Sequence, residues 1–508
     1  MDLNKFARNV SSQWITHAVT ATAGIVMPPL LEATLGREGY GVHNVVGDLG
    51  GYASFLYFGL GAAVLKYTAE HHARDELPAL NETVSTIFSV YLRLGALCVL
   101  AAAAFAAPMP GVLHVSDNLA GEARARLVML GVAIFAEFAG SVYGGVLMGM
   151  ERFDVLSVVK LASLVVRNIA IALVVLLRPS VVGVGVVTLA VTVVEQVVTA
   201  MAAHRVLPGL RVSLALYRRE RLQSLFSFSL QSFLFTMSER LINYTDNVVI
   251  AQARGAQAST PYAFPLRLVE FAREALERST HVLMPGFSAA AARGELGRLR
   301  NFWRTGTKVL MALALPVALV QVLWGRHVLS LWLAGHDAAD KQSLVAEGYP
   351  CLVWLALAFV MNIAGRGLAR PLLEGLGELR VPARVVVLEA LANLGLSIVL
   401  VRAWGIEGVA FATFLPATVT GLLVMPWHVC RRLELSFARH TVDTVLRPLV
   451  PLVPAWGVLV VAERLGLHQH LATLALTCAA VLVVYLVGAY AVVFDGDERA
   501  GLRERFRR

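Results

Sequence analysis

The chain is divided into long runs of apolar residues that are separated by short polar segments, and this pattern constrains its fold more than any other feature. Runs such as LGALCVLAAAAFAA and VLVVYLVGAYAVVF contain no charged residue. A bilayer core about 30 Å thick requires roughly twenty such residues per helix. Only 16% of the residues are charged and the mean hydropathy is +0.66, whereas a soluble domain carries about 25% charged residues. The sequence therefore predicts an all-α polytopic membrane protein without a sizeable soluble domain.

The apolar runs predict about fourteen transmembrane helices. The first group of six is expected at about residues 10–33, 42–65, 83–107, 125–148, 155–177 and 181–203. The second group of six is expected at about 222–245, 260–286, 305–333, 345–369, 383–401 and 405–428, and a final pair at about 447–464 and 469–494.

The basic residues orient these helices. The formal net charge is +9, but the arginines and lysines lie between the apolar runs, as membrane topology requires, so we expect no nucleic-acid partner. On the side of the amino terminus the loops carry about three times as many basic residues as the opposite loops. An even number of helices places both termini on one side. We therefore expect both termini to be cytoplasmic.

Two pairs of similar segments indicate an internal duplication. ARDELPAL at Ala73–Leu80 resembles ARGELGRL at Ala292–Leu299, and a second match places Asn168 opposite Asn393. Both matches are separated by about 220 residues, which corresponds to six helices. We therefore expect two six-helix lobes related by a pseudo-twofold axis along the membrane normal, with the transport path between them.

This duplication predicts the domain organisation. The amino-terminal lobe is expected at residues 1–221 and the carboxyl-terminal lobe at 222–430. A cytoplasmic linker at 431–446 and a last part at 447–508, with two helices and a basic tail, complete the chain.

Four segments resemble motifs of a known superfamily. They are LGREGYG (Leu35–Gly41), FGLGAAVLKYTAEHHA (Phe58–Ala73), DNVVIAQARGAQASTPYAFPLRL (Asp246–Leu268) and MPGFSAAAARGEL (Met284–Leu296). Their order and spacing, over about residues 1–430, resemble the multidrug/oligosaccharidyl-lipid/polysaccharide exporter superfamily and its polysaccharide (O-antigen type) flippase branch. The charge-rich span at 260–286 departs from this pattern.

The resemblance implies a MATE-like fold and a flippase of the bacterial cytoplasmic membrane. It implies that the substrate is a polyprenyl-pyrophosphate-linked oligosaccharide. It also implies alternating access between two lobes, driven by an H⁺ or Na⁺ gradient. Membrane lipids and other polysaccharide assembly proteins are the further partners we expect, and we expect no metal or organic cofactor.

Ionisable residues within the expected spans are candidates for the transport path because they are costly in a bilayer unless they face protein or water. Arginine matches phosphate oxygens well, so fixed cations in a cavity could hold the pyrophosphate. The candidates are Lys160, Arg167, Arg240, Arg267 and Arg273. Buried carboxylates could bind a coupling proton, and the candidates are Asp246, Glu270 and Glu389.

Each of these assignments has a structural alternative. The charges of the span at 260–286 could pair with one another along one helix face, or that helix could lie at the surface. Lys160 lies near a helix end and could extend to the membrane interface. Arg167 lies in mid-span, and no acidic residue lies within one turn of it.

Other function classes remain as alternatives. A drug or metabolite exporter of the same fold would favour an acidic or aromatic cavity, and the unpaired Arg167, together with Lys160, argues against it. A membrane polysaccharide polymerase would need a long outer loop, and the longest one expected has roughly 15 residues. No nucleotide-binding glycine loop with its lysine occurs, which argues against ATP as the direct energy source. We therefore predict a secondary-type transporter and not an enzyme.

Overall fold

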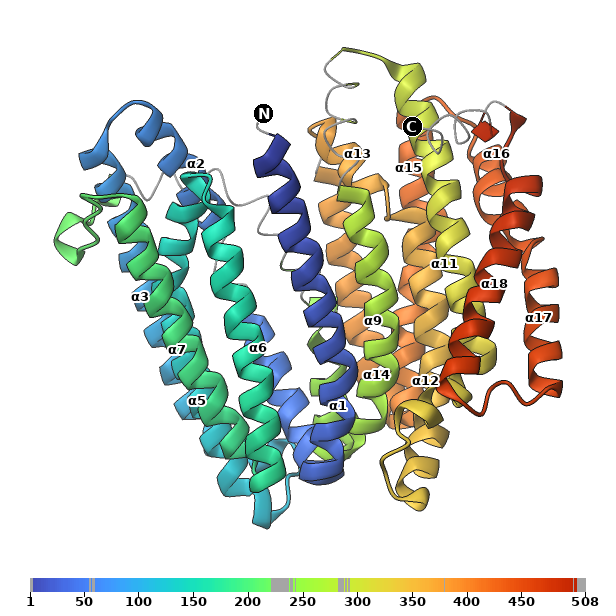
Figure 1. Ribbon diagram of the computed structural model, residues 1–508, viewed down its shortest axis with the longest axis horizontal. Helices are drawn as coiled ribbons and strands as arrows, with labels where there is room; N and C mark the ends of the chain where they lie inside the picture. The colour runs from blue at the N-terminus through green and yellow to red at the C-terminus, as the bar shows by residue number, and fades with distance from the viewer. Residues whose placement is uncertain are drawn as a thin grey trace. The chain divides into compact units, whose positions relative to one another are not determined.

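The computed structural model describes residues 3–53, 56, 60–220, 237, 241–242, 244–281, 287, 290, 293–378, 380–496 and 498–499, with side chains except at 3–18, 60–62 and 277–281. Within these ranges the regular structure is helical and contains no strand. The chain forms two compact units, Met1–Thr260 and Pro261–Arg508. The lobe boundaries at residues 221 and 430 stay predictions. Each unit is a set of helices that run side by side (Figure 1).

The first unit is built around one central helix. Helix α5 (Asp117–Gly149) packs against α3 (Leu77–Ala106) on one side and α7 (Val181–Val206) on the other. Helix α6 (Phe153–Leu177) packs against α7 and against α1 (Leu3–Ala53). The remaining elements are short: α2 (Leu60–Ala73), α4 (Met109–Val112), η2 (Leu214–Leu216), a helix at 244–254 and η3 (Ala256–Ser259).

A glycine breaks α1 where the sequence predicts a loop. Gly36 has φ 72° and ψ 169°, a backbone conformation that a residue with a side chain rarely adopts. Helix α1 therefore contains both the expected first span and the start of the second.

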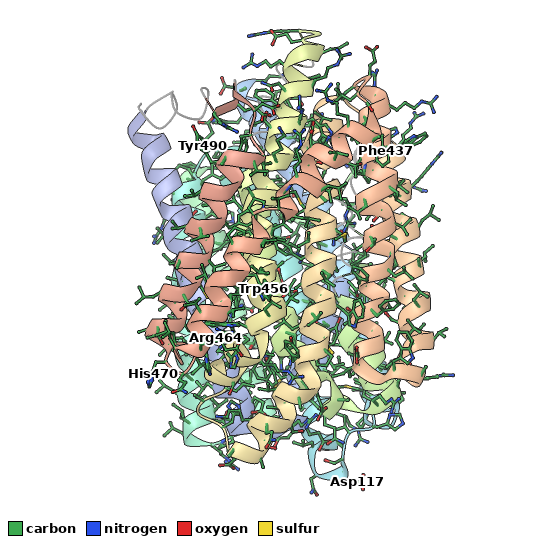
Figure 2. The ribbon with its side chains drawn as sticks, turned by 90° about the vertical axis from the view of Figure 1, so that its right-hand side faces the viewer. Asp117, Phe437, Trp456, Arg464, His470 and Tyr490 are labelled. Carbon is green, nitrogen blue, oxygen red and sulfur yellow. The ribbon has the colours of Figure 1, made fainter. Side chains whose placement is uncertain are left out.

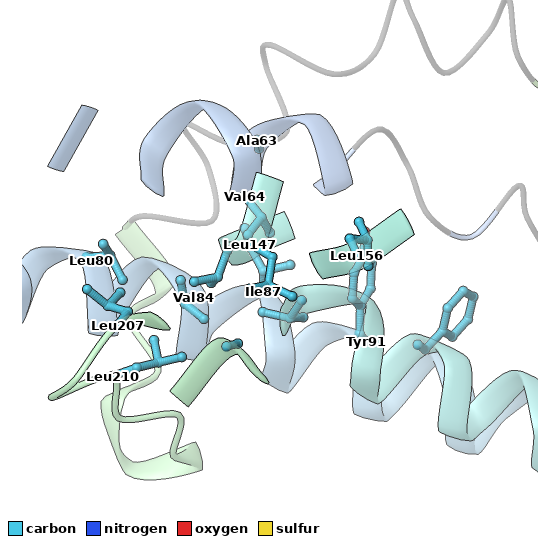
Figure 3. Packing of buried hydrophobic residues seen from close by; sticks show 14 residues of the cluster. Ala63, Val64, Leu80, Val84, Ile87, Tyr91, Leu147, Leu156, Leu207 and Leu210 are labelled. Atoms are coloured by element: carbon cyan, nitrogen blue, oxygen red, sulfur yellow. The ribbon is translucent and has the colours of Figure 1, made fainter. Parts of the chain in front are cut away.

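A hydrophobic cluster joins α2, α3 and α5 (Figure 3). Val84, Ile87 and Tyr91 of α3 lie on one face because they are spaced by three and four residues. Tyr91 stacks on Phe138 of α5 with ring centroids 5.5 Å apart. These side chains are almost fully buried, and this packing fixes α3 against α5.

The second unit begins with α9 (Thr260–His281) and continues with longer apolar helices. Helix α12 (Ala338–Gly365) packs between α11 (Leu296–Trp332) and α14 (Arg380–Thr418). Gly405, with φ 65°, breaks α14 between the two expected spans at 383–401 and 405–428. Short elements complete this part: α13 (Ala369–Gly375), the π-helix η4 (Val419–Val424) and α15 (Met425–Arg432).

The last two long helices form a hairpin. After α16 (Phe437–Thr441), η5 (Val442–Leu446) and η6 (Arg447–Leu449), α17 (Leu452–Arg464) packs against α18 (Leu471–Val492). Arg464 and His470 flank the turn at one end of the hairpin, and Phe437 and Tyr490 lie toward the opposite end (Figure 2). Trp456 of α17 is 53% exposed, as expected of an aromatic side chain that faces lipid.

Residues after α18 are fastened to α11 by a cluster of charges. The Lys308 side chain is fully buried, and its Nζ donates to Glu498 at 2.8 Å. Arg304 donates to Asp443 and to Asp495, each at 2.9 Å. Burial raises the pKa of the Glu498 carboxyl, but hydrogen bonds from Lys308, the Asp495 amide and Thr305, with the Lys308 charge, outweigh burial and lower the pKa overall.

Ten helical segments in the described ranges are long and apolar enough to cross a membrane. They include Arg380–Arg432, which contains two of the expected spans. Large apolar side chains are exposed on them, among them Leu173 of α6 and Leu476 of α18, which in water would be unfavourable. The chain is therefore an all-α, multi-pass membrane protein. Helix α9 carries too many charges to be counted, and most of the expected span at 222–245 lies outside the described residues.

Candidate functional site

A polar row runs along the buried face of α14 in the second unit. Glu389, Asn393 and Ser397 are spaced by four residues, so they lie above one another on one helix face, about 6 Å apart. Their exposed fractions are 4%, 2% and 0%. A carboxylate, an amide and a hydroxyl therefore line one buried strip of a membrane-spanning helix. We call these three residues the α14 polar row.

Two neighbouring segments supply partners to Glu389. Arg366, which follows α12, donates from Nη1 to Glu389 Oε2 at 2.9 Å. Thr420 of η4 donates from Oγ1 to the same oxygen at 2.6 Å. Arg366 also donates to the side-chain oxygen of Asn362. A buried carboxylate is tolerated when it is paired and hydrogen-bonded in this way.

A close approach of two backbones places these partners. A methyl group on Gly365 would overlap the carbonyl oxygen of Gly421, and one on Gly421 would overlap the carbonyl oxygen of Met361. Only residues without side chains allow α12 and η4 to touch here. The residues adjacent to these glycines, Arg366 and Thr420, are thereby brought to the same carboxylate oxygen of Glu389.

The other oxygens of the α14 polar row are buried with spare hydrogen-bonding capacity. Asn393 donates from Nδ2 to Thr413 Oγ1 at 2.9 Å. Among the described residues, neither Asn393 Oδ1 nor Ser397 Oγ has a hydrogen-bond partner. Buried polar atoms usually have one, so an orphaned pair next to a carboxylate is suited to a bound proton, water or hard cation. No group of three or more His, Cys, Asp or Glu ligands occurs in the described part of the chain.

The first unit contains an ion pair between α6 and α7. Arg167 of α6 donates from Nη2 to Glu195 Oε2 of α7 at 3.3 Å, and their side chains are 32% and 16% exposed. A methyl group on Gly140 of α5 would overlap the side chain of Gln196, the neighbour of Glu195. Gly140 and Gln196 are separated from Gly365 and Gly421 by one common offset of about 225 residues, as a duplicated unit predicts.

This ion pair corrects the description of Arg167 as unpaired. The acidic partner lies on the next helix, 28 residues away, and therefore cannot be found by searching one helical turn. Arg167 is therefore not a free cation, and its charge no longer speaks against a drug exporter. Lys160 is exposed on α6.

The charges of α9 pair in part along their own helix. Arg267 donates from Nη1 to Glu270, three positions later, at 2.9 Å, and the side chains are 50% and 18% exposed. Arg273 is half-buried. Self-pairing along the helix face, the structural alternative for this segment, therefore applies to Arg267 and Glu270.

Asp246 lies in a buried polar group of the first unit. Thr245, Asp246 and Asn247 are each about 5% exposed or less. Asn247 donates to Asp48 of α1 at 2.7 Å, and Tyr52 of α1 donates to Thr245 at 2.9 Å. Arg240, the remaining candidate, lies outside the described residues.

The sequence reasoning missed Arg366, Thr420 and Asp48 as site residues. Arg366 lies in the last turn of the expected span at 345–369. A basic residue is common at such a position, so the sequence did not indicate that Arg366 would pair with a buried carboxylate. The glycines could have indicated this site. Gly365 precedes Arg366 and Gly421 follows Thr420 within apolar runs, and glycines in membrane helices often lie where two helices cross closely.

Comparisons with known proteins agree with this architecture. Residues 6–290, more than half of the chain, match the family described as polysaccharide biosynthesis protein. A protein of Shigella flexneri that is named as an O-antigen transporter is 21% identical over 434 residues, which cover 82% of this chain and 96% of that protein.

Solved structures share the fold at low sequence identity. The lipid II flippase MurJ in an inward closed conformation superposes with a TM-score of 0.73 at 11% identity, covering 95% of this chain and 98% of MurJ. An inward-facing multidrug resistance MATE family transporter of the MOP superfamily superposes with a TM-score of 0.69 at 16% identity, covering 82% of this chain and 95% of the transporter. A MOP superfamily transporter from Pyrococcus furiosus gives 0.59 at 16% identity, with 85% and 96% covered. With its family match and its MOP-type fold, the chain belongs to the polysaccharide biosynthesis protein family of multi-pass membrane proteins.

Proposed function

We propose that this protein is a flippase that moves a polyprenyl-pyrophosphate-linked oligosaccharide across the bacterial cytoplasmic membrane. The observation that carries the proposal is the membrane-embedded ion pair in each unit, Arg167–Glu195 and Arg366–Glu389, in a chain of the polysaccharide biosynthesis protein family. Charged pairs between spanning helices are expensive and mark transport paths. The O-antigen transporter name of the Shigella flexneri relative supports the substrate class.

In this proposal the basic side chains bind the pyrophosphate group. Lys160, Arg167, Arg240, Arg267 and Arg273 are the candidates, because arginine and lysine offer several donors to phosphate oxygens. Arg167 would exchange Glu195 for the pyrophosphate when substrate binds. Such an exchange keeps the guanidinium paired in both states, which limits the cost of a charge within the bilayer.

Ion coupling is assigned to the buried carboxylates. Glu389 is the leading candidate because Asn393 Oδ1 and Ser397 Oγ add two further oxygens on the same helix face. Asp246 and Glu270 are the other candidates. Binding of H⁺ or Na⁺ at Glu389 would weaken its pairing with Arg366, and this change could bias the packing of α12 against α14.

The proposed mechanism is alternating access without a catalytic step, with both termini in the cytoplasm. Other polysaccharide assembly proteins are proposed as further partners. The second candidate is an exporter of drugs or small metabolites, which the fold of the MATE family transporter supports.

Transport by purified protein in proteoliposomes tests both candidates. A fluorescent polyprenyl-pyrophosphate sugar should be translocated, and an organic-cation dye should not. Translocation of the dye alone would favour the exporter. Replacing Arg167 and Arg240 together by glutamine should abolish translocation of the lipid in a protein that still elutes as a single species.

A further inference from the structure

We propose that the loop after α7, together with one arginine of α3, forms a binding platform for anionic phospholipid headgroups. The platform consists of Arg93, Arg205, Arg211, Leu214 and Arg218, all in the first unit. It differs in place and partner from the ion pairs of the proposed transport path, and it does not depend on the identity of the transported molecule.

The loop is held against the start of α3 by a set of hydrogen bonds. Asn81 donates to the carbonyl of Gly209 at 3.1 Å and accepts from the Arg211 amide at 3.0 Å. Ser85 accepts from the Ser213 amide at 3.1 Å, and Thr86 accepts from the Arg218 amide at 3.0 Å. Irregular backbone near a membrane needs such partners, and here three side chains of one helix supply them. The loop is therefore a built element with a defined position.

This fixed loop presents apolar and basic side chains outward. The η2 segment has no buried residue, and Leu214 is 60% exposed. Arg205 and Arg211 are also exposed, and neither side chain has an ion-pair partner in the described ranges. Arg218 donates from Nε to Glu82 Oε1 at 3.4 Å. A loop with an exposed leucine and exposed arginines is suited to the boundary between acyl chains and phosphates.

Arg93 gives the second, independent observation. It lies inside the apolar part of α3, where Leu97 and Leu100 are 55% and 67% exposed, and its own side chain is exposed. Its guanidinium packs over the Tyr217 ring at 4.9 Å from the centroid, and no carboxylate pairs with it among the described residues. A lipid-facing arginine extends toward the headgroups, where a phosphate can neutralise it.

The loop end of the unit is a membrane boundary. Helix α7 ends at Val206 and α3 begins at Leu77, and the hydrogen bonds of Asn81, Ser85 and Thr86 place the loop beside the first turns of α3. Helix α3 has 30 residues, so at about 1.5 Å per residue it exceeds a hydrocarbon core of about 30 Å. Its first turns, with the loop attached, therefore reach the headgroup region.

Binding of a short-chain fluorescent phosphatidylglycerol to the full-length protein in detergent tests the platform, with phosphatidylcholine as the neutral comparison. The double variant Arg93→Gln/Arg211→Gln should bind phosphatidylglycerol about 25-fold more weakly, since each arginine near an anionic surface contributes about fivefold. The control Arg124→Gln/Arg178→Gln makes the same charge change at the other end of the unit, where Glu122 joins α5 to the start of α7. It should bind like the wild type.

Variants of Tyr217 test whether the position of the Arg93 guanidinium, and not only its charge, matters for binding. Tyr217→Leu should weaken phosphatidylglycerol binding severalfold without changing the net charge, and Tyr217→Phe, which retains the ring, should not. Equal weakening by the two double variants would overturn the proposal, and so would equal affinity of the wild type for both phospholipids. Binding of a polyprenyl pyrophosphate but not of phosphatidylglycerol would also overturn it, because the surface would then belong to the substrate.

Discussion

Arg366 and Glu389 form a buried ion pair at 2.9 Å, with side chains that are 21% and 3% exposed. The two residues belong to different parts of the chain: Arg366 follows α12, and Glu389 lies in α14. The pair therefore joins two spanning helices inside the second unit, and its loss should affect both stability and transport.

We predict that Glu389→Gln abolishes coupled transport and destabilises the protein. Removing one partner of a buried pair leaves the other charge uncompensated, at a cost of about 3–5 kcal/mol. The double variant Arg366→Gln/Glu389→Gln should regain much of the thermal stability, because no lone charge remains, but not the transport. Thermal unfolding in detergent and proteoliposome transport measure the two effects. Full transport by the double variant would show that the pair is only structural.

The Arg167–Glu195 pair should matter for transport more than for stability. The Arg167 side chain is about one-third exposed, so solvent reduces the energy of the pair. Arg167→Gln should lower the transport rate about tenfold or more with a small change in unfolding temperature. Arg152→Gln is the control, because Arg152 starts the same helix and pairs with Asp154 at the surface. Equal transport by both variants would remove Arg167 from the proposed path.

The glycine crossings give a graded prediction. Gly365→Ala should destabilise the protein by about 1–3 kcal/mol, because the added methyl meets the rigid backbone of Gly421. Gly140→Ala should also destabilise the protein, since the added methyl meets Gln196 Cβ at 2.5 Å, an atom that rotation of the side chain does not move. Gly395→Ala in α14 meets nothing within 4 Å and should be neutral or slightly stabilising. Thermal unfolding of the three variants ranks them, and the reverse order would contradict the account.

Stability at low pH should depend on Glu498. Its pKa is lowered in the folded protein, so its ionised form contributes stability above the carboxyl pKa of the unfolded chain, about 4.3. That contribution is lost as the pH falls through the lower folded value. Glu498→Gln should therefore lower the unfolding temperature at pH 7 and flatten its fall toward acid pH. The control Glu434→Gln removes a carboxylate that is 74% exposed and should leave the pH profile unchanged.

Much of the fold could be predicted from the sequence because hydrophobic length is a local property. The helices α3, α5, α6 and α7 lie close to the expected spans. The break at Gly36 falls in an expected loop, and the break at Gly405 falls at the first residue of the span expected at 405–428. The span at 260–286 was expected to be unusually rich in charge. Helix α9 lies there, and it is too polar to be one of the ten apolar segments that could cross a membrane.

The partners of the charged residues could not be predicted, because they depend on how helices cross. Glu195 lies on the helix next to that of its partner, and Arg366 lies at the end of a neighbouring helix; they are 28 and 23 residues from their partners. The helical period relates only residues on one helix. It can therefore predict the Arg267–Glu270 pair, but not the Arg167–Glu195 and Arg366–Glu389 pairs. The glycines that allow the crossings are visible in the sequence, but which pair of glycines meets is decided by the packing of the whole unit.

Translocation of a fluorescent polyprenyl-pyrophosphate sugar, by the wild type and by Glu389→Gln in proteoliposomes with and without an imposed H⁺ or Na⁺ gradient, tests the central claim most directly. The account predicts that a gradient accelerates translocation by the wild type and has no effect on the variant. A wild-type protein that leaves this lipid in its original leaflet under every gradient would contradict the proposed function, and equal acceleration of both proteins would contradict the role of Glu389.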